Sequence, residues 1–98
     1  MSAQAPSEKS GTLEFADFVH RVDAALRSST HAERFDAASA MARWTTRERT
    51  ATVESVAPRN VSVTLDGAGE SAVTTWYPCD AALVAVVSRR IASYLGEA

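Results

Sequence analysis

The single cysteine of the chain, Cys79, directly precedes Asp80 and the expected start of a helix. Free backbone amides and the helix dipole at such a position can lower the pKa of a thiol, whereas a neighbouring acid opposes this effect. Neither His20 nor His31 lies in a motif that would place an imidazole beside the thiol. We therefore interpret Cys79 as an inert junction residue, and keep a small enzyme or carrier with a pocket near Cys79 as one alternative.

His20 lies between two acids, Asp17 and Asp23, each three residues away. Such a trio could bind a metal ion, but its spacing does not match the usual zinc motifs and no cysteine joins it. The same acids form acid-then-base pairs with Arg21 and Arg27, four residues further along, which is typical of ion pairs on the solvent-facing side of a helix. The sequence therefore predicts no metal and no cofactor.

A local basic cluster with an aromatic residue lies just before the middle of the chain: Arg43, Trp44, Arg47 and Arg49. Arginine can bind phosphate and tryptophan can stack on a base, so this cluster supports a nucleic-acid-binding accessory protein as another alternative. The whole chain carries 10 basic and 12 acidic residues, a formal net charge of −2, which does not favour a nucleic acid as partner. The sequence has no glycine-rich phosphate loop and no nucleophilic serine elbow, so nothing in it favours an enzyme.

The stretch AVTTWYPCDAAL, residues 72–83, places Trp76 and Tyr77 side by side. Adjacent residues of a strand point to opposite faces, so the two rings cannot both enter one core from a regular strand. Either the strand ends near Thr75 and Trp76 packs on a helix, or Trp76 lies on an open sheet face and contacts a protein partner. In the second interpretation the surface around Trp76 is rich in hydroxyl groups, from Thr50, Thr52, Thr64 and Thr74.

Two helices are expected in the first half of the chain. Apolar residues at spacings of three and four, from Phe15 to Leu26, predict a helix over residues 12–28 with Thr12 as its cap. Thr30 and Glu33 form a capping box, and the alanine-rich segment that follows predicts a second helix up to about Trp44.

The second half changes to a period of two. Three strands are expected, Arg49–Val56, Val61–Leu65 and Ser71–Tyr77, joined by turns that contain proline, asparagine or glycine. Asp80 is expected to cap a last helix over Ala81–Leu95, which ends at Gly96. The predicted fold class is α+β: a two-layer domain of order α-α-β-β-β-α, with a three-stranded antiparallel meander covered on one face by helices.

Length and composition set the outer limits of function. Ninety-eight residues suffice for one domain, which we place at residues 12–98 behind a flexible N-terminal tail at residues 1–11. The start of the sequence lacks the pattern of a signal peptide, no apolar run could span a membrane, and one cysteine cannot form an internal disulfide, so we expect a cytoplasmic protein. The preferred hypothesis is a small non-enzymatic interaction module that binds a protein partner, in the simplest case itself as a homodimer, through the open face or edge of its sheet.

Overall fold

The computed structural model describes residues 11–28, 32, 34–57, 59–67 and 69–96, and the predicted capping box, His31 and nearly all of the predicted tail lie outside these ranges. Within these ranges the chain forms one helix, then five strands, then a short 3₁₀ turn that leads into another helix. In chain order these are α2 (Phe15–Arg27), β1 (Arg34–Ala37), β2 (Met41–Thr45), β3 (Arg49–Val56), β4 (Asn60–Gly67), β5 (Glu70–Pro78), η1 (Ala81–Leu83) and α3 (Val84–Leu95). The predicted α+β class is therefore confirmed, while the predicted order of elements is wrong.

The first helix begins three residues later than its sequence predicts. Thr12 does not cap it, because Thr12 forms a bridge with Asp80 and the Leu13 amide donates to the Cys79 carbonyl at 3.0 Å. The chain leaves this short pairing at Glu14, which occupies the cap position without a side-chain hydrogen bond. The start of the domain is thus tied to the junction before α3.

The predicted second helix is the main error, because the described part of that segment forms the hairpin β1–β2. Alanine favours a helix but also fits a strand, so the long-range partners of this segment decide its structure. Here Ala42 and Trp44 pair with Val53 and Ala51, and both point into the core. Trp44 is only 1% exposed, and burying an indole of this size outweighs the small loss of helix propensity.

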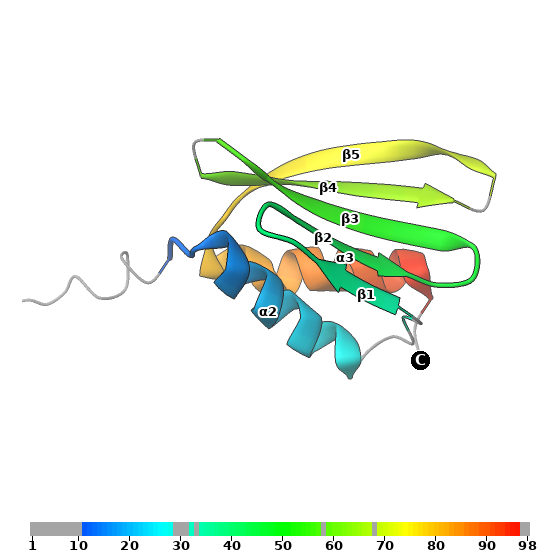
Figure 1. The fold of residues 1–98 in the computed structure, drawn as a ribbon, viewed down its shortest axis with the longest axis horizontal. Coiled ribbons are helices and arrows are strands. Elements are labelled where there is room, and N and C mark those ends of the chain that lie inside the picture. The colour runs from blue at the N-terminus through cyan, green and yellow to red at the C-terminus, as the bar shows by residue number, and fades with distance from the viewer. Residues whose placement is uncertain (1–10, 29–31, 33, 58, 68, 97–98) are drawn as a thin grey trace, which may run out of the picture.

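All five strands form one antiparallel meander in the order β1-β2-β3-β4-β5 (Figure 1). The alternation predicted for β3 and β4 is confirmed for their buried apolar residues, which lie on one face of the sheet, while Ser62 is the one buried residue of these two strands on the other face. The buried apolar residues are Ala51, Val53, Val61, Val63 and Leu65. A regular pleat places their neighbours on the other face.

Both helices cover the same face of the sheet (Figure 1). Phe18, Val22 and Leu26 of α2 and Val87 and Ile91 of α3 fill the space beneath the strands. α3 lies against α2, β3 and β4. Asp80 is a cap as predicted, its Oδ1 accepting from the Ala82 amide at 2.7 Å, but it caps η1, and α3 itself begins only at Val84. Among the described residues, neither helix is long and apolar enough to cross a membrane.

Candidate interaction surface

The face of the sheet that the helices leave open carries all five residues predicted to form an interaction site. The register places Thr52, Thr64 and Thr74 in one row across β3, β4 and β5, and the hydroxyls of Thr64 and Thr74 lie 2.9 Å apart. Thr50 and Trp76 lie on the same face in neighbouring rows, since each is an even number of residues away from this row along its own strand. The predicted residues therefore share one surface.

Trp76 is the most exposed large hydrophobic residue of this surface, at 63%. β5 continues beyond it to Pro78, and Trp76 pairs with Ser62 on the open face. The interpretation in which the strand ends near Thr75 and Trp76 packs on a helix is therefore wrong. Tyr77, its neighbour, points the other way and packs against the core. An indole displayed on an uncovered sheet face can bury a large apolar area against a partner.

At the β5 edge, apolar side chains are exposed on the helix-covered side of the sheet as well as on the open face. Val73 of β5 is 50% exposed and Val86 of α3 is 45% exposed, although both continue the apolar pattern of their elements. α3 packs under β3 and β4 rather than under β5, so the last strand is covered only in part. A groove of about 450 Å³ remains there, lined by Leu65, Tyr77, Val86, Arg89, Arg90 and Ser93.

Val73 and Val86 are therefore members of the surface that sequence reasoning missed. Each continues a correct apolar periodicity, so the pattern alone assigns both to the core. Their exposure depends on where α3 crosses the sheet. The one signal in the sequence is the absence of charge from Ser71 to Pro78, which is unusual for an end strand.

The two outer strands differ in length and charge. β1 has four residues, all exposed, with Arg34 and Asp36 forming an ion pair at 3.0 Å. β5 has nine residues and carries no charge between Ser71 and Pro78. Short, charged edge strands resist pairing with other chains, whereas long uncharged ones permit it. Within the described part of the chain, β5 is the less protected edge.

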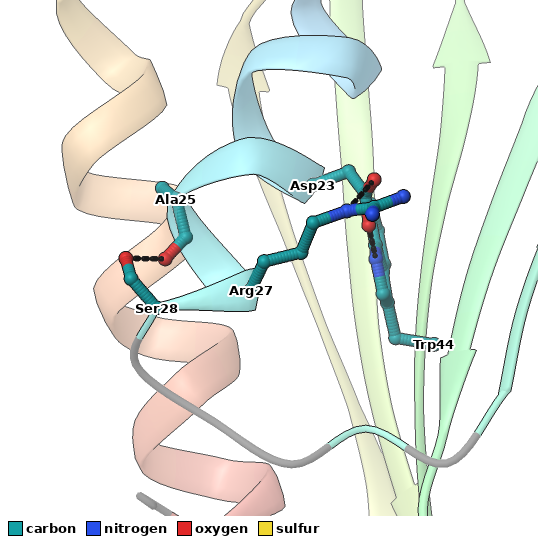
Figure 2. Close-up of polar contacts among 5 residues, drawn as sticks. All are labelled: Asp23, Ala25, Arg27, Ser28 and Trp44. Atoms are coloured by element: carbon teal, nitrogen blue, oxygen red, sulfur yellow. Dashed lines mark hydrogen bonds and ion pairs between the residues drawn. The ribbon is translucent and has the colours of Figure 1, made fainter.

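Trp44, the aromatic member of the predicted basic cluster, serves the fold. Its Nε1 donates to Asp23 Oδ1 at 3.0 Å, and Arg27 Nε donates to the other oxygen of the same carboxylate at 2.9 Å (Figure 2). Phe35 stacks on its ring, with centroids 5.1 Å apart. Because Trp44 is buried, it has no free ring face on which a nucleotide base could stack.

The three arginines of that cluster do not converge either. Arg43 lies on the open face beside Thr52, and Arg47 is exposed in the turn between β2 and β3. Arg49 reaches the far end of α3, where it donates to the Tyr94 carbonyl at 2.7 Å and lies over the Tyr94 ring. The cluster is continuous in sequence but divided in space.

Cys79 is buried at the junction between β5 and η1, and its Sγ donates to the Leu13 carbonyl at 3.3 Å. Burial raises the pKa of this thiol above its ordinary value of 9.0, and the charges of Asp80 and Glu14 raise it further. A cavity of about 530 Å³ does adjoin the residue, with Thr12, Glu14, Asp17, Arg59 and Asn60 in its wall. A raised pKa keeps the thiol protonated at neutral pH, which disfavours a nucleophilic role.

The histidine and acids of α2 do not form a common site. His20 and Asp17 are exposed, whereas Asp23 is buried and bonded to Trp44. No group of three histidine, cysteine or acidic side chains suited to a metal ion occurs in the residues that the structure covers. The sequence places Asp23 on the solvent-facing side of the helix, and this prediction is wrong, because the indole of Trp44 draws the carboxylate inward.

Comparison with known proteins assigns the chain to no family. No protein-family model matches the chain, and no curated protein or solved structure shows significant similarity to it.

Proposed function

We propose that this protein is a small non-enzymatic interaction module that associates with a second copy of itself at the β5 edge of its open sheet face. The observation that carries the proposal is Trp76, which is 63% exposed on the end strand, on the face without helices. Tryptophan is enriched among the residues that contribute most binding energy at protein interfaces. Most of the surface of this residue is therefore available to a partner.

The surroundings of Trp76 support the same proposal. Val73 and Val86 add exposed apolar surface at the same edge, on the side of the helices. The strand between Ser71 and Pro78 has no charge that would repel an identical strand. A surface that is apolar, neutral and bordered by unpaired backbone groups is suited to a protein partner rather than to a nucleic acid. Neither Cys79 nor the arginines near Trp44 have comparable geometric support.

Light scattering of the wild type and of Trp76→Ala tests the proposal. We expect the wild type to reach the mass of two chains, and Trp76→Ala to weaken the association by on the order of 30-fold, the equivalent of about 2 kcal/mol. Phe35→Ala removes an exposed aromatic ring at the opposite edge and should leave the association unchanged. Circular dichroism establishes that each variant is folded. A wild type that keeps the mass of one chain up to high micromolar concentration would refute self-association.

A further inference from the structure

The backbone of β5 has one set of amides directed to β4 and another directed to the open edge. The Cys79 amide donates to the Arg59 carbonyl at 2.9 Å. In an antiparallel pair, residues that exchange hydrogen bonds alternate with residues that do not. The register continues from this bond without interruption to Leu65 and Val73, so Val73, Thr75 and Tyr77 direct their backbone groups to β4. Thr74 and Trp76 must then direct theirs outward.

Two local features limit the stretch that is free to pair. Pro78 occupies an outward-facing position, where its missing amide costs the sheet nothing but ends the row of donors. At the other end the register shifts between Leu65 and Gly67, which makes Ser71 and Ala72 oppose the single residue Asp66. A bulge of this kind disrupts regular pairing. The regular, uncharged part of the open edge is therefore Val73–Tyr77, and Thr75 is its midpoint.

We infer that two copies pair through β5 in antiparallel orientation, about a twofold axis at Thr75. This inference rests on the proposed self-association and specifies its geometry. Thr74 then lies opposite the partner's Trp76 and exchanges two hydrogen bonds with it, and Trp76 does the same with the partner's Thr74. Every outward amide of the regular stretch finds a carbonyl.

The side chains of this register are self-complementary. On the open face the two Trp76 rings become diagonal neighbours, about 7–8 Å apart at their Cα atoms, within reach of aromatic side chains. On the side of the helices Val73 lies opposite the partner's Tyr77, so the half-covered groove beside α3 gains apolar cover. The uncharged stretch Val73–Tyr77 of one copy lies against the same uncharged stretch of the other.

The bulge and Pro78 make the neighbouring registers less favourable. Moving the axis to Thr74 requires Ala72, in the bulge, to pair with the partner's Trp76. Moving it to Trp76 places Thr74 opposite the partner's Pro78, which has no amide to donate. Thr75 is the only one of the three positions at which neither Thr74 nor Trp76 pairs with an irregular or donor-free residue.

A proline substitution separates this register from other modes of self-association. Thr74→Pro removes an amide that the fold of one chain does not use, so we expect a folded protein with the mass of one chain. Thr74→Ala is the matched control, because it loses the same hydroxyl but keeps the amide, and it should remain associated. Circular dichroism and light scattering on the two variants read out fold and mass.

Cysteine cross-linking reads the register directly, in a Cys79→Ala background. Thr75 faces its own copy across the axis in a pair without hydrogen bonds, with Cα atoms about 4.5 Å apart, which suits a disulfide. Thr75→Cys should therefore form a covalent dimer under mild oxidation, and Thr74→Cys and Trp76→Cys should not. If Thr74→Pro associates as the wild type does, or if another position cross-links in place of Thr75, this register is wrong and the proposed self-association stands. A wild type of one-chain mass refutes both.

Discussion

The carboxylate of Asp23 connects helix α2 to strand β2, and its hydrogen bond to Trp44 explains why Asp23 is buried. One oxygen accepts from Trp44 of β2 and the other from Arg27 of its own helix (Figure 2). The ion pair itself follows from the spacing of four residues in the sequence, but the indole does not, because Trp44 lies 21 residues away. Spacing along one helix cannot reveal a partner that comes from a strand.

Removal of the Asp23 carboxylate should destabilise the fold measurably. Asp23→Ala leaves the Trp44 Nε1 donor buried without its acceptor, so we expect the free energy of unfolding to fall by about 1–3 kcal/mol. Asp23→Asn keeps an acceptor oxygen and should lose less. Asp17→Ala changes an exposed acid of the same helix and should stay within about 0.5 kcal/mol of the wild type. Urea denaturation of the three variants checks this, and equal losses for Asp23→Ala and Asp17→Ala would contradict the role given to Asp23.

Cys79 should make stability depend on pH in the alkaline range. Because the fold raises the pKa of this thiol, the folded state favours the protonated form. Its contribution is complete below the pKa of the unfolded chain, about 8.5–9, and is lost as the pH rises through the higher folded pKa. Relative to Cys79→Ala, the wild type should therefore lose stability as the pH rises above the ordinary pKa of a thiol. Unfolding by urea across this range measures the difference, and parallel curves for both proteins would show that the thiol is not coupled to folding.

The turn between β4 and β5 depends on one glycine for a steric reason. Gly67 has a φ of +131°, and a Cβ atom there would overlap the Glu48 carbonyl oxygen and lie 2.8 Å from the Arg49 Cα. Gly67 is also held by Tyr94, whose hydroxyl donates to the Gly67 carbonyl at 3.3 Å. The end of β4, the start of β3 and the end of α3 therefore meet at a position that only glycine fits.

Alanine at this turn should separate the steric effect from the backbone effect. Gly67→Ala combines a positive φ with a clash against the β3 backbone, so we expect a loss of more than about 2 kcal/mol. Gly69 also has a positive φ, +77°, but open space around its Cβ position, and Gly69→Ala should cost only about 1–2 kcal/mol. Thermal or urea denaturation compares the two. A smaller loss at Gly67 than at Gly69 would contradict the close packing of β3 against this turn.

Strong periodicity made some elements predictable and weak periodicity concealed others. α2, β3, β4, β5 and the helix after Asp80 follow from patterns that fit only one type of element. The segment that ends at Trp44 does not, because its alanines fit a helix or a strand equally well and its structure depends on contacts with β3. The open face also follows from alternation, whereas the bulge at Ser71 and Ala72 does not, since a bulge exists only relative to a partner strand.

The whole molecule is a sheet with unequal sides and unequal edges. Both helices cover one face (Figure 1). The other face presents threonines and Trp76, and from Ser71 to Pro78 the longer edge lacks the charges of the shorter one. Pairing of β5 with a second copy would join two sheets into one, with all helices on the same side. That arrangement would cover part of the exposed surface of Val73 and of Trp76 without any change in the fold of a single chain.

Sedimentation velocity of the wild-type protein over a concentration series is the most direct test of this account. It predicts that the weight-average mass rises with concentration from one chain towards two and then levels off, because a pairing about a twofold axis closes on itself. A mass that stays at one chain throughout the series, or that grows past two without a plateau, would contradict it.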